Sequence, residues 1–260
     1  MPLDLAALVD PFLEIVRNAA SIVKEHDARP RSVTHKGRID LLTETDPAVE
    51  AALTRDLAAL LPGSTFLAEE TSAQAALGDL TWVIDPLDGT TNFAHGLPVH
   101  AVSVGLWEQG RVVLGAVAAP CLGELFHAVR GGGAFLNGAP VTVTDTAEIE
   151  KALVATGFPY AIREEIGQIL PNLERVLLAS QGVRRLGAAA LDLAYVACGR
   201  FDAFYECRLN PWDVAAGWLL VEEAGGQVTD YAGGPYRMGM KYILASNGRV
   251  HGKVSSLLKV

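Results

Sequence analysis

The sequence has few cysteines, no cluster of basic residues and no long hydrophobic run, and each shortage excludes a class of protein. Its cysteines, Cys121, Cys198 and Cys207, are odd in number and form no Cys-x-x-Cys, which argues against a disulfide framework or a structural zinc site. We therefore expect small, buried, reduced thiols and a cytoplasmic protein. The formal net charge is -9 at pH 7 without a Lys or Arg stripe, so we expect no nucleic-acid partner.

The sequence also lacks the signals typical of membrane-spanning and exported proteins. The N-terminal segment 5–23 has helical apolar spacing, but acidic residues interrupt any signal-peptide core. The apolar run 112–122 is too short, and too rich in Gly and Pro, to cross a bilayer. We expect no membrane partner.

Half of the 260 residues are hydrophobic, which is enough for a full core. The predicted helices are residues 5–23, 46–61, 164–179, 188–198 and 214–224. The predicted strands are residues 65–68, 82–85, 99–107, 111–118 and 124–129, then 153–156, 183–186, 201–206, 227–229 and 243–246. The chain is thus of the α/β class, with an α+β half at residues 1–146 and an α/β half at residues 147–260. We expect the site in a cleft between these halves.

The most informative segment is the run Trp82-Val83-Ile84-Asp85-Pro86-Leu87-Asp88-Gly89-Thr90-Thr91-Asn92-Phe93. Its apolar start predicts a buried strand. Pro86 and Gly89 predict a tight turn that points Asp85 and Asp88 at one place. Carboxylate oxygens are ligands that Mg²⁺ prefers. The free backbone N–H groups after these aspartates can bind an anion beside the cation.

Other acids are expected to join this pair. Glu69, next to Glu70, follows a predicted strand, and Asp213 begins a predicted helix. Each residue also has a local interpretation: Asp85 and Asp88 as turn residues, and Asp213 as an acid favoured at a helix start. Clustered carboxylates repel one another unless a cation binds them, so convergence favours a metal site.

The spacing of the two aspartates also bears on the mechanism. Two residues separate Asp85 from Asp88, whereas phosphatases with an aspartate nucleophile have one residue in the corresponding place. We therefore expect water to be the nucleophile.

With these segments, the chain closely resembles the inositol monophosphatase family of Mg²⁺-dependent, Li⁺-sensitive phosphatases. The resemblance spans residues 36–246 and is carried by residues 69–70, 82–93, 133–138, 155–159, 185–194, 212–217 and 223–226. It implies a layered α-β-α-β-α sandwich of the inositol monophosphatase/fructose bisphosphatase type. It also implies a homodimer with its site between the two halves of each chain.

The resemblance further implies a role for individual residues. Glu69, Asp85 and the backbone carbonyl of Leu87 would hold one Mg²⁺, and Asp85, Asp88 and Asp213 a second. A third, weaker ion is expected near Glu69.

The catalytic residues implied by the resemblance are Thr90, Asp46 and Glu69, with Thr90 and Asp46 placing the attacking water. Asp46 also has a local interpretation as a helix cap before Pro47. The N–H groups of Gly89 and Thr90 would hold phosphate. The implied substrate contacts are Glu206, Ala189 and Asp88.

The expected reaction is hydrolysis of a small phosphate monoester, with inositol 1-phosphate as the first candidate. Fructose 1,6-bisphosphate, histidinol phosphate, NADP and 3′-phosphoadenosine 5′-phosphate are the alternatives, and a non-catalytic binding module is a further one. Glu206 matches a position that contacts inositol hydroxyls, although a surface acid closing a strand would look the same. Ala188 stands where relatives often have Ser or Thr. Arg184 and Arg185 would either bind an additional phosphate group of the substrate or belong to an ordinary connection between a helix and a strand.

Overall fold

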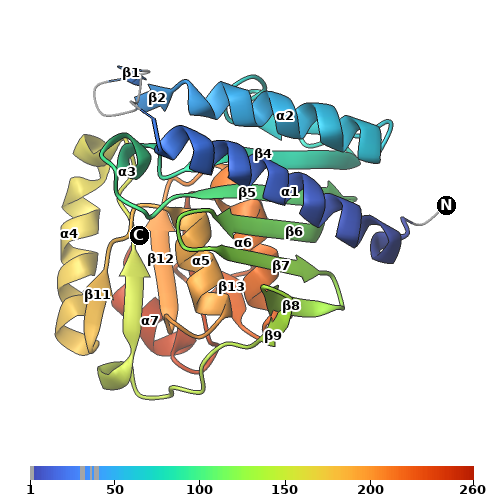
Figure 1. Cartoon of the computed structure of the whole chain (residues 1–260). Coiled ribbons are helices and arrows are strands. Elements are labelled where there is room, and N and C mark those ends of the chain that lie inside the picture. The colour runs from blue at the N-terminus through green and yellow to red at the C-terminus, as the bar shows by residue number, and fades with distance from the viewer. Residues whose placement is uncertain (1–2, 30–32, 36, 38–40) are drawn as a thin grey trace.

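The computed structural model describes residues 3–29, 33–35, 37 and 41–260, and two β-sheets organise this part of the chain (Figure 1). Lys36, where the resemblance begins, lies outside the described residues. The seven-stranded sheet contains, in spatial order, β3 (Thr65–Ala68), β4 (Leu80–Asp88), β5 (Ala101–Glu108), β6 (Arg111–Ala119), β7 (Glu124–Val129), β8 (Gly133–Leu136) and β9 (Ala139–Val141). The five-stranded sheet contains β11 (Gly182–Arg184), β10 (Leu153–Thr156), β12 (Ala203–Cys207), β14 (Tyr242–Ser246) and β13 (Gln227–Thr229). A separate pair joins β1 (Val33–His35) to β2 (Leu41–Thr43).

The helices lie in layers around these sheets (Figure 1). Helices α1 (Leu5–Asp27) and α2 (Thr45–Leu60) cover the outer face of the larger sheet. Helices α5 (Ala189–Ala197) and α6 (Pro211–Glu223) lie between the sheets, and α4 (Ile162–Ala179) and α7 (His251–Leu257) cover the smaller sheet from outside. The short helix α3 (Thr90–Ala94) follows β4, and a 3₁₀ turn spans Ile149–Lys151. This order confirms the expected α-β-α-β-α sandwich.

The central helices are buried because sheets cover them on both sides. A helix in such a layer needs apolar residues all round, and α5 and α6 have them. Helix α6 also lies unusually close to the larger sheet. A Cβ on Gly105 would lie 2.9 Å from Cβ of Ala215, and one on Gly115 would lie 3.0 Å from Cα of Ala216. Glycine at these strand positions therefore sets the distance between α6 and the sheet.

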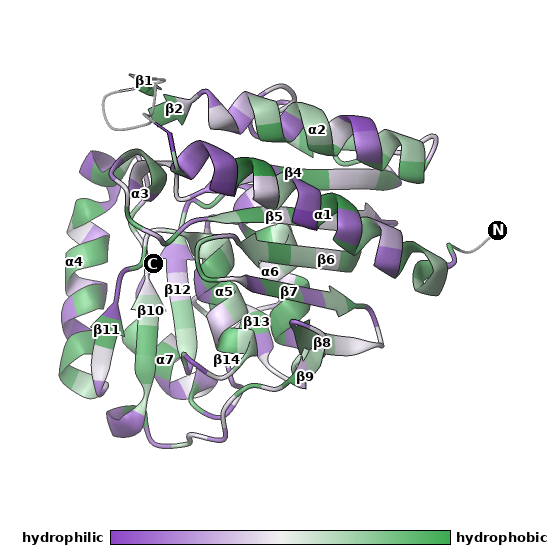
Figure 2. Cartoon of the chain, in the orientation of Figure 1, coloured by the Kyte–Doolittle hydropathy of each residue, from purple (hydrophilic) through white to green (hydrophobic). Residues whose placement is uncertain are grey.

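The outer helices are amphipathic, and Figure 2 shows hydrophilic and hydrophobic residues mixed along α1, α2 and α4. Helix α1 buries Phe12, Val16 and Val23 completely. The ring of Phe12 stacks on Trp82 of β4 with centroids 5.4 Å apart. Burying a side chain of this size stabilises the fold by about 1.5–3 kcal/mol, so this stripe holds α1 on the sheet.

Several predicted boundaries were wrong, and three of these differences affect the site. Strand β4 runs through Asp88 instead of turning at Pro86, with a register shift between Asp85 and Asp88. Helix α6 begins at Pro211 because proline is well suited to the first turn. Strand β11 ends at Arg184, which leaves the next residues in the connection to α5.

None of the three cysteines is in a disulfide, as expected, but only Cys207 is fully buried. Cys121 and Cys198 are half-buried, so the prediction of burial was wrong for these two. In the described part of the chain, no helix has both the length and the apolar character that crossing a bilayer requires. The larger sheet comes from residues 65–141 and the smaller from 153–246, while the division into halves at residue 146 stays a prediction.

Candidate active site

A pocket of about 120 Å³ opens where β4 ends and helices α3, α5 and α6 begin. Its walls contain nine of the residues predicted from the sequence, namely Glu69, Asp85, Leu87, Asp88, Gly89, Thr90, Ala189, Glu206 and Asp213. Asp46 lies behind Thr90, to which it is hydrogen-bonded. Segments from both halves of the chain therefore meet at one site.

The two aspartates of β4 are held by backbone N–H groups. The N–H of Leu87 donates to Oδ1 of Asp85 at 3.0 Å. Asp88 accepts the N–H groups of Ala189 (3.2 Å) and Ala190 (2.7 Å) at the start of α5. The register shift in β4 places both carboxylates in the pocket wall without the expected turn.

Gly89 is required where β4 passes into α3. Its φ is +89°, and a Cβ there would lie 3.0 Å from the carbonyl oxygen of Val99. A larger residue would therefore be strained and crowded. Asn92, one turn into α3, donates to the carbonyls of Val99 (2.7 Å) and Leu186 (2.8 Å), which joins α3 to the second half of the chain.

The Thr90 hydroxyl has two acceptors within reach, Oδ1 of Asp46 at 3.2 Å and the carbonyl of Leu87 at 3.0 Å. The other oxygen of Asp46 accepts the N–H (2.9 Å) and the hydroxyl (2.5 Å) of Thr43. The local interpretation of Asp46 as the cap of α2 was wrong, because the helix begins at Thr45 and the Asp46 carboxylate faces back to Thr43. Burial is the main cause that raises the pKa of Asp46.

Asp213 lies both at the start of a helix and in the pocket wall, so its two interpretations from the sequence hold together. Its Oδ2 accepts the N–H of Asn210 at 2.6 Å, which stabilises the start of α6, and its side chain lines the pocket. Glu69 follows β3 and also lines the pocket. Glu70 has a different setting, since its N–H donates to Glu50 of α2 at 2.8 Å.

Burial raises the pKa values of Asp85, Asp88 and Asp213, and neighbouring carboxylates add to the shift for Asp85 and Asp213. Burial, followed by the charges of Glu69, Asp88 and Asp213, raises the pKa of Asp85 well above its ordinary value. Burial raises the pKa of Asp88 to about 6, although the N–H groups of α5 oppose the shift. Burial and then the charge of Asp88 raise the pKa of Asp213. A divalent cation would relieve this repulsion, and carboxylate and carbonyl oxygens are ligands that Mg²⁺ prefers, so the donor set fits such an ion.

Glu206 lines the pocket from strand β12 of the smaller sheet. It is buried in strand β12, and desolvation raises its pKa to about 8. The alternative of a surface acid was therefore wrong. Its carboxylate lies directly against Gly157, where a Cβ would come within 2.0 Å of Oε2.

Two further residues belong to this region: Arg185, for which the sequence left two interpretations open, and Asp192, which the sequence analysis did not identify. Arg185 lies in the pocket wall, with its guanidinium carbon 5.6 Å from the ring centre of Phe158, and its charge lowers the pKa of Glu206 and Asp88. Asp192 is buried in α5, and burial and the charge of Glu206 raise its pKa. Its position one helical turn after Ala189 was the signal that could have indicated it.

Comparison with known proteins identifies the family of this chain. A model of the inositol monophosphatase family matches residues 4–259. The chain belongs to this family. It is therefore a phosphatase, a phosphate monoester hydrolase, of a metal-dependent family that acts on small phosphorylated substrates.

Relatives of this inositol monophosphatase family protein cover nearly its whole length. An inositol monophosphatase from Dictyostelium discoideum is 39% identical, with 98% of this chain and 94% of the relative covered. A fructose-1,6-bisphosphatase/inositol-1-monophosphatase from Thermotoga maritima is 37% identical, with 95% and 93% covered. The solved structure of the extragenic suppressor protein suhB from Bartonella henselae superimposes with a TM-score of 0.91 at 37% identity, covering 97% of this chain and 98% of that one.

Proposed function

We propose that this phosphatase hydrolyses inositol 1-phosphate to inositol and phosphate with Mg²⁺ as its cofactor. The observation that carries the proposal is the convergence of Asp85, Asp88 and Asp213 with Glu69 in one pocket that also contains the buried carboxylate of Glu206. The carboxylates at the end of β4 can bind cations. Glu206 can bind a polyol, because a carboxylate can accept hydrogen bonds from two neighbouring hydroxyls.

Glu69, Asp85 and the carbonyl of Leu87 would hold one Mg²⁺. Asp85, Asp88 and Asp213 would hold a second, and a third would sit near Glu69. The Leu87 carbonyl lies 3.0 Å from the Thr90 hydroxyl, and a carbonyl oxygen has two lone pairs, so one is available for an ion even when the hydroxyl donates to the other. Bound Mg²⁺ would neutralise charge on the phosphate oxygens and make a water molecule more acidic.

Thr90 and Asp46 would orient the attacking water and take up its proton. The Thr90 hydroxyl can give its proton to Asp46 while its oxygen accepts one from water. Burial raises the pKa of Asp46, which makes this carboxylate a better proton acceptor. The hydrogen bonds from Thr43 hold Asp46 in place for this role. The N–H groups of Gly89 and Thr90 would bind the phosphate oxygens.

The polyol would lie between Glu206, Asp88 and the backbone of Ala189. Asp88 and Glu206 are close enough for the charge of Asp88 to raise the pKa of Glu206. Ala188 is buried and offers no hydroxyl, so the carboxylates and backbone groups would supply the polar contacts. Gly157 leaves the room that the Glu206 carboxylate occupies.

Fructose 1,6-bisphosphate is the second candidate because Arg185 lies in the pocket wall, where a second phosphate could reach its guanidinium. A Thermotoga maritima relative is named for both activities. Histidinol phosphate, NADP and 3′-phosphoadenosine 5′-phosphate are further candidates, without a specific contact in favour of any of them. A homodimer, a cytoplasmic location, Li⁺ sensitivity and the lack of a nucleic-acid partner remain predictions from the sequence.

Phosphate release from these five compounds, measured as kcat/KM with saturating Mg²⁺, tests the choice of substrate. We expect the highest value for inositol 1-phosphate. Arg185→Ala separates the two leading candidates, because it should lower kcat/KM for fructose 1,6-bisphosphate by about tenfold or more and change inositol 1-phosphate less. A higher kcat/KM for any other compound would contradict the proposed substrate.

A further inference from the structure

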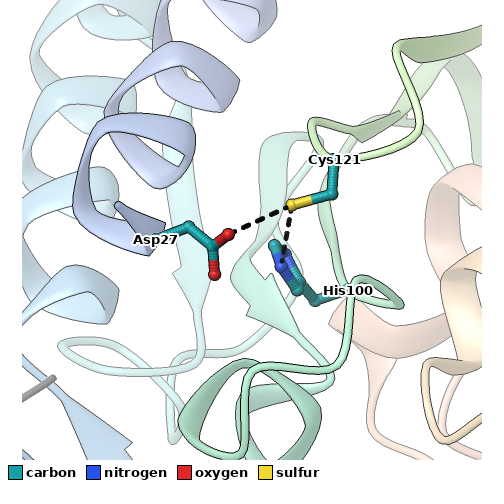
Figure 3. A group of neighbouring side chains, drawn as sticks. All are labelled: Asp27, His100 and Cys121. Atoms are coloured by element: carbon teal, nitrogen blue, oxygen red, sulfur yellow. Dashed lines mark hydrogen bonds between the residues drawn. The ribbon is translucent and has the colours of Figure 1, made fainter. Parts of the chain in front are cut away.

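A second group of ligand-type side chains lies outside the carboxylate pocket (Figure 3). Asp27 is the last residue of α1, His100 directly precedes β5, and Cys121 lies in the turn between β6 and β7. Sγ of Cys121 lies 3.6 Å from Oδ2 of Asp27 and 3.5 Å from Nε2 of His100. One ligand atom from each of the three residues falls within 4.8 Å of the others.

These separations fit a tetrahedral metal ion. An ion with bonds of about 2.3 Å to sulfur and about 2.0–2.1 Å to nitrogen or oxygen places those atoms about 3.5–3.6 Å apart. Both sulfur distances agree with this value. We propose that Asp27, His100 and Cys121 bind one Zn²⁺-type ion, with water in the fourth position.

The ligand chemistry separates this site from the Mg²⁺ pocket. Thiolate sulfur and imidazole nitrogen select Zn²⁺ or Co²⁺, whereas Mg²⁺ takes oxygen ligands. The carboxylate pocket offers only oxygen. When both kinds of ion are present, Zn²⁺ or Co²⁺ should therefore bind at Cys121 and Mg²⁺ should bind in the carboxylate pocket.

A nucleophilic triad is the alternative that the geometry disfavours. In such a triad the acid orients the imidazole through the nitrogen that faces away from the nucleophile. Here Oδ2 of Asp27 contacts the sulfur instead, so the acid and the imidazole both converge on Cys121. Convergence of all three ligand atoms on one another is the arrangement that an ion requires.

One of the three residues is completely buried, and the other two are partly exposed to solvent. His100 is completely buried, and its ring packs edge-on against Phe93 of α3 with centroids 5.2 Å apart. Asp27 and Cys121 are half-buried, which leaves a route for an ion. Binding would replace the thiol proton, so one proton is released for each ion bound at Cys121. The ion would tie the end of α1 to two connections of the larger sheet.

Co²⁺ added to the full-length protein in excess Mg²⁺ tests this proposal. A thiolate ligand gives Co²⁺ a charge-transfer band that oxygen ligands do not give, so the readout is independent of activity. We expect one equivalent of Co²⁺ to produce the band in the unmodified protein. Cys121→Ser should abolish it, and Cys198→Ser, which changes another half-buried free thiol, should leave it intact.

A second variant keeps the test decisive if Cys121→Ser fails to fold. Asp27 ends a surface helix, and Asp27→Asn changes a carboxylate to a weaker amide ligand without altering size. We expect this variant to fold and to bind Co²⁺ at least about tenfold more weakly. Absence of the band in the unmodified protein, its persistence in folded Cys121→Ser, or unchanged Co²⁺ affinity in Asp27→Asn would each overturn the proposal.

Discussion

At the scale of single residues, Asp88 joins the predicted metal site to the second half of the chain. Its oxygens accept the N–H groups of Ala189 and Ala190 and also face the pocket. Asp88→Asn removes the charge that an ion would contact. Loss of a partner behind a metal ligand costs about 10–100-fold, so losing a direct ligand should lower kcat/KM by more than about 100-fold.

The matched control for this change is Asp230→Asn. Asp230 also holds a backbone N–H, that of Gly234 at 2.7 Å, but it does not line the pocket. We expect its activity to stay within a few-fold of the unmodified enzyme. Equal activity of Asp88→Asn and Asp230→Asn in saturating Mg²⁺ would contradict the role of Asp88.

Gly157 offers a way to move Glu206 without removing it. A Cβ at this position would lie 2.0 Å from Oε2 of Glu206, and a side-chain end can shift more easily than backbone. Gly157→Ala should therefore fold, displace the carboxylate and raise KM for inositol 1-phosphate about tenfold or more, with a smaller change in kcat.

Gly167→Ala is the matched glycine control, because nothing lies within 4 Å of a Cβ there and the position is in helix α4. This variant should keep KM and gain about 0.5–1 kcal/mol of stability from helix propensity. An unchanged KM in both variants would mean that Glu206 does not contact the polyol.

The sequence predicted which residues belong to the site better than it predicted their contacts. Each acid of the pocket has a local explanation when it is taken alone, and the acids were identified because several of them, from separate segments, match the motifs of one family. Asp46 was ambiguous for a physical reason: an acid before proline is a common helix start, and only the fold shows that its partners are Thr43 and Thr90. Arg185 could not be placed because its position depends on where β11 ends.

At the scale of elements, the junction of β4 with α3 determines the geometry of the phosphate end of the pocket. Gly89 has a φ of +89° and lies against the Val99 carbonyl. Gly89→Ala should cost about 1–2 kcal/mol for the left-handed backbone and more for the 3.0 Å contact. The variant should also bind inorganic phosphate more weakly. Phosphate is a product of the proposed reaction and would compete with the substrate for the N–H groups of Gly89 and Thr90.

Gly63→Ala isolates the backbone contribution. Gly63 has a φ of +90°, and nothing lies within 4 Å of a Cβ there. Chemical unfolding of both variants should show the larger loss for Gly89→Ala, and phosphate inhibition should change only in that variant. A loss of stability as large in Gly63→Ala would show that the Val99 contact contributes nothing.

Most elements were predictable because their hydrophobic periods are clear, as in α1 and the antiparallel strands of the larger sheet. The end of β4 was not, because Pro86 is a turn residue in isolation. In the structure a register shift keeps the strand paired through Asp88. Such a shift depends on β5 beside it, which local propensity does not describe.

At the scale of the whole molecule, the layers bury carboxylates that an unfolded chain would expose. Burial raises the pKa of Glu206 from 4.5 to about 8. Between these values the folded protein holds a proton that the unfolded chain has released. The free energy of unfolding contributed by this group is therefore complete below pH 4.5 and is lost as the pH rises through about 8.

Urea unfolding in EDTA, at several pH values across this window, checks the sign. We expect the metal-free protein to lose stability as the pH rises, and Glu206→Gln to lose less because its side chain does not titrate. Equal pH dependence in the two proteins would show that Glu206 ionises normally when folded. Mg²⁺ at about 100 times its Kd should restore about 2.7 kcal/mol to the unmodified protein.

The central claim is that the pocket hydrolyses a phosphate monoester with Mg²⁺ held by its carboxylates. The most direct test is phosphate release from inositol 1-phosphate as Mg²⁺ is titrated into EDTA-treated enzyme, for the unmodified chain and for Asp213→Asn. We expect phosphate release to rise from background to saturation in the unmodified enzyme and to be lower by more than about 100-fold in the variant. Release that is independent of Mg²⁺, or equal in the two proteins, would contradict it.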